Sequence, residues 1–244
     1  MIDFLNSLNT QTTSSIRYIG VTRAIPSISL ASDLDAKGQR RMDIYFSNKY
    51  EGFKAKYSIW FKDELAQSKT GKFRFIDNRA NTSIWVDDVT GIQDINFNIN
   101  QSRKAKIGEV EFVEFMKAWT SYNKNFKVDF PQFDIGKIVS GDLSELQPIF
   151  DKLKDTEVVI CVGVKEDRYQ EVLPFFQPSW TLPSGNDEKS INQITKTLDR
   201  FGKAIAKSLS TAIFANILLT KYEEYNKDSA ATTVVADTAD EIPF

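Results

Sequence analysis

The feature that most constrains the fold is a series of short β-type runs between residues 16 and 86, each separated from the next by a turn signal. Runs rich in β-branched and aromatic side chains, with apolar and polar residues alternating, are typical of strands that bury one face. Gly38 and Gly71 lie between runs, where a tight turn needs backbone angles that glycine accepts. The runs occupy residues 16–22, 41–46, 54–62, 72–76 and 83–86.

Two later segments complete the predicted fold. Residues 109–122 carry apolar side chains at three- and four-residue steps, which predicts a helix. Residues 157–164 form a continuous, β-branched run that is typical of a central strand. Five short, mostly antiparallel strands with a helix between the fourth and the fifth match an OB-fold, an open Greek-key barrel. We therefore expect a mainly β protein with helices (α+β), an OB-fold-like five-stranded barrel with large loop insertions at 87–108 and 123–156.

The C-terminal part follows a different pattern. From Ser190, which suits a helix N-cap, apolar residues recur at three- and four-residue steps to residue 226 and predict one long helix. Its apolar face has two candidate partners of equal standing, the barrel and a second copy of the chain. The predicted organisation is a polar arm at 1–15, an OB-like nucleic-acid-binding domain at 16–189, a helix at 190–226, and a flexible linker with an acidic tail at 227–244.

The composition excludes several classes of chemistry. The chain has no histidine, which removes Ser-His and Cys-His catalysis and the commonest metal ligand. Its one cysteine, Cys161, lies in an apolar run and is expected to be buried. Phosphate-binding glycine motifs are absent, so we expect neither a cofactor nor enzymatic activity. With no leader and no long apolar run, a cytoplasmic protein without membrane association is expected.

Basic and aromatic residues are interleaved in residues 37–79. The segment holds eleven Lys or Arg, five Asp or Glu and nine aromatic residues, although the whole chain has a net charge of −2. Lys and Arg neutralise phosphates, and bases stack on rings at about 1–3 kcal/mol each, without reading sequence. The segment predicts a surface for single-stranded DNA. Together with the basic stretch before the helix, the predicted contact residues are Arg40, Arg41, Lys54, Lys56, Trp60, Lys72, Phe73, Arg74, Phe75, Arg79, Arg103, Lys104 and Lys106.

Strand alternation divides these residues between two faces. Along the third predicted strand, Lys54, Lys56 and Trp60 share one side, which we expect to face solvent, while the intervening residues form core. Aromatic side chains also favour strands and burial, so about half of the nine rings are expected to be core. Phe73 and Phe75 share one face of the next strand, and for them stacking and burial stay open.

The chain ends in an acidic segment with an apolar terminus. Proline stiffens the backbone, and the terminal phenylalanine combines an apolar anchor with a free carboxylate. The segment resembles the acidic tip of bacterial single-stranded DNA-binding proteins, which closes in Ile-Pro-Phe. The resemblance implies a docking peptide for replication or recombination proteins. Its residues are Asp237, Asp240, Glu241, Ile242, Pro243 and Phe244.

Two internal stretches are similar to single-stranded DNA-binding proteins of bacteriophages: Arg103-x-Ala105-x-x-Gly108-Glu109 followed by Phe115-x-x-x-Trp119, and Arg168-Tyr169-Gln170-Glu171. The resemblance implies a phage-encoded protein of replication, recombination or repair, acting in the cytoplasm of a bacterial host. The bacterial family has a shorter domain and a linker rich in Gly, Gln and Pro, so its tetramer is not expected here.

Two other functions are carried as alternatives. Asp33 with Asp35, and Asp87 with Asp88, are acidic pairs that a carboxylate-only metal nuclease on an OB-like core would need. Such pairs in turns are more often simply solvated. A protein-only adaptor, binding through the long helix and the acidic tip, is the second alternative.

Overall fold

The computed structural model describes most of the chain between residues 16 and 224. The described residues are 16–77, 83–86, 102–125, 133–165, 169–183, 187–207, 212–214 and 217–224. The predicted N-terminal arm, the predicted linker and the acidic tail lie outside the described residues.

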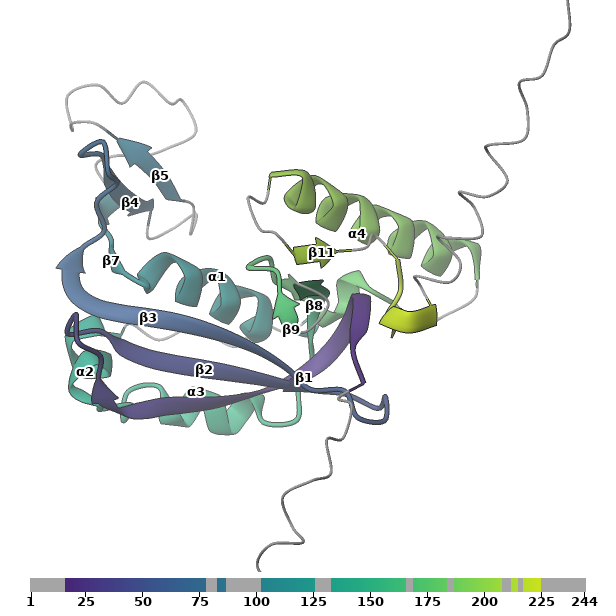
Figure 1. The fold of residues 1–244 in the computed structure, drawn as a ribbon, viewed down its shortest axis with the longest axis horizontal. Helices are drawn as coiled ribbons and strands as arrows, with labels where there is room; N and C mark the ends of the chain where they lie inside the picture. The colour runs from purple at the N-terminus through teal and green to yellow at the C-terminus, as the bar shows by residue number, and fades with distance from the viewer. Residues whose placement is uncertain are drawn as a thin grey trace, which may run out of the picture.

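A curled antiparallel sheet, shaped like half of a barrel, forms the body of the protein (Figure 1). Its longest strand, β1 (Tyr18–Leu34), pairs first with β8 (Val158–Lys165) and further along with β2 (Arg40–Ser47). β2 pairs with β3 (Ala55–Leu65), and β3 pairs with the short β7 (Lys106–Ile107). The prediction of a mainly β fold with helices is confirmed.

Short strands extend this sheet, and three others form a second one. Pairing with β8 are β9 (Tyr169–Val172), β10 (Gln177–Pro178) and β11 (Ala212–Phe214), and β12 (Thr220–Lys221) pairs with β1. A 3-10 helix, η3 (Ser179–Thr181), follows β10. The second sheet has the order β5 (Ser83–Val86), β4 (Phe73–Asp77), β6 (Ser102–Lys104).

The strand prediction therefore needs correction in number and partnership. The fourth and fifth predicted runs are strands, but they belong to the small sheet and not to the curled one. The first run continues to Leu34, because residues beyond its predicted end pair with β2, in one register from Ile25 to Leu30 and with a register shift before Leu34. Five barrel strands are therefore not confirmed.

Helix α1 (Glu109–Thr120) fills the hollow of the curled sheet, where a helix was predicted. Phe112 and Phe115 are fully buried, and the ring of Phe112 meets the rings of Phe61 and Phe133 edge-on at centroid distances of 5.6 and 5.2 Å. Two short helices, α2 (Ile135–Ser140) and α3 (Gln147–Leu153), contribute to the same core. They lie within the segment that the sequence predicts as a loop insertion.

Strand β8 is buried on both faces, as its continuous apolar run predicts. Val158, Ile160 and Val162 belong to the core beneath α1, whereas Val159 and Cys161 face a second cluster on the other side. Burial raises the pKa of the Cys161 thiol to about 12. Cys161 is thus a buried apolar residue, as expected.

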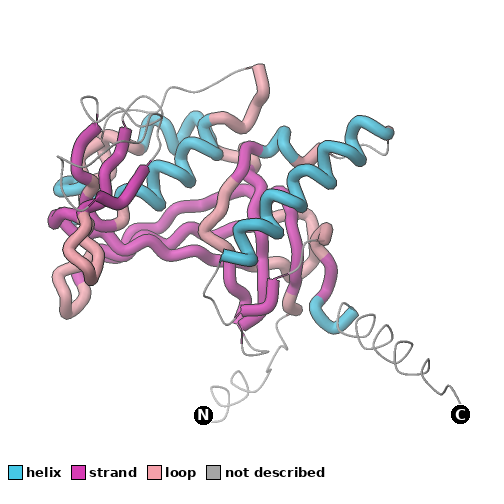
Figure 2. Tube along the Cα trace, turned by 90° about the horizontal axis from the view of Figure 1, so that it is seen from above, coloured by secondary structure: helices cyan, strands magenta, loops and turns pink. Residues whose placement is uncertain are grey.

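The prediction of one helix over residues 190–226 is wrong. Helix α4 (Glu188–Lys207) lies across strands of the sheet (Figure 2). Ile194 and Leu198 pack on the second cluster, and the chain then forms β11 and β12. The apolar spacing suits a helix equally well. However, free edges on β8 and β1 offer backbone partners, and the amide of Val21 donates to Ile217 O at 2.8 Å. None of the helices in the described ranges is long and apolar enough to cross a membrane.

Candidate nucleic-acid interface

The convex side of β2 and β3, here called the outer face, is a polar surface with exposed rings. The alternation predicted for β3 is confirmed, since Ala55, Ile59 and Phe61 are buried and Lys56 and Trp60 are exposed. The antiparallel register places residues of both strands opposite one another in pairs. The outer face consists of Arg41, Asp43 and Tyr45 on β2 and Lys56, Ser58 and Trp60 on β3.

A carboxylate that the sequence analysis does not single out lies at the centre of the outer face. Asp43 is almost buried and receives a hydrogen bond from Ser58 Oγ at 2.6 Å. Its oxygens also lie 3.2 Å from Arg41 Nε and 3.7 Å from Lys56 Nζ. Because one carboxylate holds two cations, the cluster keeps a net positive charge and both cationic side chains are oriented.

Two exposed rings border this cluster. Trp60 is 40% exposed, and the guanidinium carbon of Arg41 lies 5.7 Å from the centre of its ring. Tyr45 is 47% exposed on the neighbouring strand. Lys54, just before β3, is exposed as well. Exposed rings beside oriented cations are the combination that single-stranded nucleic acid uses, because bases stack while cations neutralise phosphates.

The small sheet carries a second pair of an arginine and a tryptophan. The guanidinium carbon of Arg74 lies 5.2 Å from the centre of the Trp85 ring, and Nη2 of Arg74 donates to Ser83 Oγ at 2.5 Å. Trp85 is 44% exposed. Sequence reasoning did not place Trp85 in the site, although pairing β4 with β5 in register sets it opposite Arg74.

The open question about Phe73 and Phe75 has a structural answer. Phe75 is 5% exposed and packs with Val86, while Phe73 and Ile84 flank them as partly buried neighbours. The two phenylalanines are therefore the core of the small sheet. Lys104 Nζ lies 3.9 Å from the centre of the Phe73 ring, covering its outer side.

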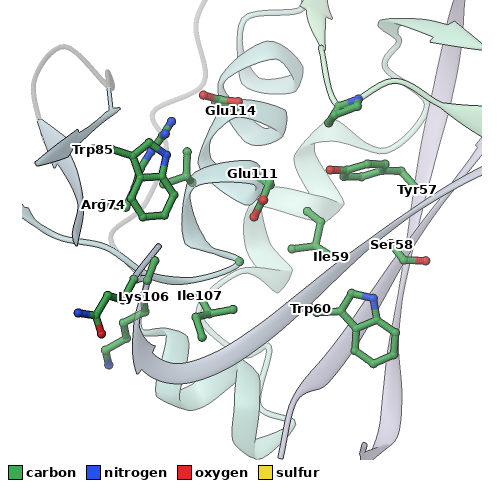
Figure 3. Close-up of a pocket in the computed structure, with 15 residues that line it drawn as sticks. Tyr57, Ser58, Ile59, Trp60, Arg74, Trp85, Lys106, Ile107, Glu111 and Glu114 are labelled. Carbon is green, nitrogen blue, oxygen red and sulfur yellow. The ribbon is translucent and has the colours of Figure 1, made fainter. Parts of the chain in front are cut away.

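A cleft of about 700 Å³ separates β3 and α1 from the small sheet (Figure 3). On the α1 wall, Glu111 and Glu114 project toward it, and on the opposite wall lie Arg74 and Trp85. The Trp60 ring lies on the other side of β3 from Ile59, so it borders the cleft from the outer face. The cleft is lined by Tyr57, Ser58, Ile59, Trp60, Ala66, Gln67, Arg74, Trp85, Lys106, Ile107, Gly108, Val110, Glu111, Glu114 and Pro174.

Partial desolvation and neighbouring charges set the electrostatics of this cleft. Desolvation raises the pKa of Glu114, although the side chain keeps contact with solvent, and the nearby Arg74 partly offsets the rise. Burial, reinforced by Glu111 and Glu114, raises the pKa of the Tyr57 phenol, which stays protonated. Burial lowers the pKa of Arg74, and both glutamates counteract this. One wall of the cleft therefore offers hydrogen-bond donors, from Arg74, and the other offers acceptors, from Glu111 and Glu114.

The basic stretch before α1 is tied to carboxylates. Arg103 forms a forked ion pair with the buried Glu109, whose hydrogen bond raises the pKa of Arg103. Lys106 Nζ lies 2.5 Å from Asp63 and 3.5 Å from Asp134, and the bond to Asp63 raises its pKa. These contacts fix the junction between the small sheet and α1.

One predicted contact residue, Arg40, has a different position from the one expected. Arg40 is buried, and its guanidinium donates to the carbonyl oxygens of Val139, Ala31 and Ser32. The expectation of an exposed Arg40 is therefore wrong, since the side chain ties β2 to α2 and to the end of β1. Lys72, the residue before β4 of the small sheet, is half-buried. Arg79 lies outside the described residues.

The acidic pairs proposed for a nuclease find no support in the described part of the chain. Asp35 caps the turn at Gly38, accepting from the backbone amides of Lys37 at 2.9 Å and Gln39 at 2.7 Å. Asp87 and Asp88 lie outside the described residues. No group of three or more metal-binding side chains occurs within the described ranges.

Comparisons with known proteins add no relative. A scan against protein-family models, a search of curated proteins and a search of solved structures each find no match to this chain.

Proposed function

We propose that the protein binds single-stranded DNA, coating the strand through phosphate contacts and base stacking without sequence specificity. The observation that carries the proposal is the outer face, where Trp60 and Tyr45 are exposed beside Arg41 and Lys56. Exposed rings beside oriented cations form a surface on which bases can stack while the cations neutralise phosphates.

The curled antiparallel sheet supports a finer structural proposal, an OB-like barrel. OB-folds present one face of a curved sheet, bordered by loops, to an oligonucleotide. In this chain the candidate surface lies on β2 and β3 and continues toward the small sheet, with Tyr45 at one end, Trp60 beside the cleft and Trp85 across it. A strand crossing the outer face would reach the cleft beside Trp60.

Replacing Trp60 by alanine tests the proposal directly. Affinity for a fluorescently labelled oligothymidylate, followed by anisotropy, should weaken by about 1–3 kcal/mol because one stacking platform is lost. The melting temperature should change little, since the ring is not in the core. Trp180→Ala is the matched control: it is 41% exposed, lies in η3, and donates from its indole to Ser121 O. Equal losses of affinity in both variants would contradict a specific role for Trp60.

The same titration separates the alternatives. Binding of oligothymidylate without cleavage in the presence of Mg²⁺ is the expected result, whereas degradation that requires Mg²⁺ would favour a carboxylate-metal nuclease. If the oligonucleotide is neither bound nor cut, the result would favour the alternative of a protein-only adaptor.

We further propose that residues 237–244 recruit a replication or recombination protein. The acidic tip and Phe244 suit an apolar pocket flanked by Arg or Lys.

Deleting residues 237–244 should abolish capture of such a protein. It should leave DNA affinity equal or tighter at low salt, because a competing negative charge is removed. Removing Phe244 alone should weaken partner capture without altering DNA affinity. Much weaker DNA binding by the truncated protein would contradict this role.

The packing of α4 determines whether its apolar face is free to pair with a second copy of the chain as a homo-oligomer. Ile194 and Leu198 already pack on the body of the protein. Pairing of two copies through this helix face is therefore not proposed.

A further inference from the structure

The cleft beside Trp60 combines groups that complement one particular base. Its α1 wall offers two carboxylates, Glu111 and Glu114, one turn apart on the helix. Its opposite wall offers the guanidinium of Arg74 and the exposed indole of Trp85. Figure 3 places these four side chains around the same opening, with the Tyr57 phenol on a third side.

Arg74 has unused hydrogen-bonding capacity. Its Nη2 bonds to Ser83, but its Nε is buried and has no hydrogen-bond partner among the described residues. A buried donor without an acceptor is unfavourable. Nε itself has almost no exposed surface, so a ligand in the cleft would bond to the N–H groups of Nη1 and Nη2 that Ser83 does not use.

The acidic wall decides which part of a DNA strand enters. A phosphate in the cleft would face Glu111 and Glu114, and like charges at short range repel. The cationic outer face, with Arg41 and Lys56, is the better place for the backbone. A base is therefore favoured as the occupant, stacked on Trp85. The volume of about 700 Å³ accommodates a base and its sugar.

Among the four bases, guanine matches both walls. Its N1–H and its 2-amino group are adjacent donors that one carboxylate accepts together, and its O6 and N7 are the acceptors that arginine prefers. Thymine offers a single N–H between two carbonyl oxygens, which a carboxylate disfavours. Adenine and cytosine place a ring nitrogen acceptor next to their amino group.

We propose that this cleft binds an unstacked guanine of the bound strand, with Glu111 and Glu114 accepting from its Watson–Crick edge, Arg74 donating to O6 and N7, and Trp85 stacking on the ring. The inference rests on the proposed function and adds to it. The strand as a whole is held without regard to sequence, and the cleft adds a preference at one nucleotide.

The test compares oligothymidylates in which isolated positions carry deoxyguanosine or deoxyinosine, which lacks only the 2-amino group. The wild-type protein should bind the guanine-containing strand about tenfold more tightly than the inosine-containing strand. In the Glu111→Gln/Glu114→Gln double variant this ratio should fall below about twofold, because the paired acceptors are gone. Glu188→Gln, which removes the same charge from the first turn of α4, should keep the wild-type ratio.

A second base analogue tests the contact between guanine and Arg74. Replacing the guanines by 7-deazaguanine removes N7 and should weaken binding to the wild-type protein. In Arg74→Lys, which loses the fork but keeps the charge, the same replacement should have little effect. These ratios are independent of a general change in affinity or folding, because both strands are measured on one protein sample.

The outcomes separate the inference from the function on which it rests. Equal affinity for the guanine and inosine strands, with oligothymidylate still bound, would overturn the guanine site and leave single-stranded DNA binding intact. Failure to bind any of the oligonucleotides would overturn both. A lost preference in Glu188→Gln would show that net charge, and not the cleft, produces the ratio.

Discussion

Replacing Phe112 by alanine should lower the free energy of unfolding by about 3–5 kcal/mol, the largest effect that we expect from a single substitution. Phe112 is fully buried and connects three parts of the molecule, since its ring meets Phe61 of β3 and Phe133 before α2. Its removal leaves a cavity where the sheet, α1 and the α2 region meet, and such a site cannot collapse without moving a whole helix. Denaturant unfolding followed by circular dichroism measures the change.

Tyr45→Ala is the matched control for this prediction. Tyr45 is an aromatic residue of the same sheet, but it lies on the outer face and is 47% exposed. Its loss should change the free energy of unfolding by less than about 1 kcal/mol. If both variants unfold at the same denaturant concentration, α1 does not occupy the hollow of the sheet.

Gly108→Ala should lower the free energy of unfolding by about 2–4 kcal/mol, from left-handed strain together with overpacking. Gly108 has a φ of +81°, and a Cβ there would lie 2.5 Å from Trp60 O and 3.0 Å from Phe61 Cδ1. A backbone oxygen in the middle of β3 has little freedom to move. Alanine at this position would therefore push the start of α1 away from β3.

Gly38→Ala separates the two causes of this loss. Gly38 has a similar φ of +71°, but a Cβ there would meet no atom within 4 Å. Only the conformational cost, about 1–2 kcal/mol, should appear. Thermal or denaturant unfolding of both variants gives the difference. Equal destabilisation would mean that the close contact between Gly108 and β3 carries no cost of its own.

Much of the candidate site was predictable from local pattern. The alternation in β3 placed Lys56 and Trp60 on the exposed side and Ile59 and Phe61 in the core, because successive side chains of a strand point to opposite faces. The helix α1 was predictable from its helical period, and the doubly buried strand β8 from its continuous, β-branched apolar run.

Local sequence patterns did not predict which residues these side chains contact. Asp43 holds Arg41 and Lys56 only because β2 and β3 pair in one register. Arg40 was expected to be exposed, yet α2, almost a hundred residues away in sequence, supplies an acceptor at Val139 O. The cleft exists because a separate small sheet faces α1, and nothing in the residues between 72 and 114 specifies that arrangement.

The sequence by itself determined the β-rich class, the buried and exposed sides of the central strands, the helix α1 and the enrichment of cations and rings. Local propensity and side-chain period are properties of neighbouring residues and need no knowledge of the remaining chain. Only the tertiary structure decided the division into a curled sheet and a small sheet, the end of α4 at Lys207, and the meeting of Glu111, Glu114, Arg74 and Trp85. These features depend on which sheet edges find backbone partners and which walls face each other, and contacts between distant segments set both.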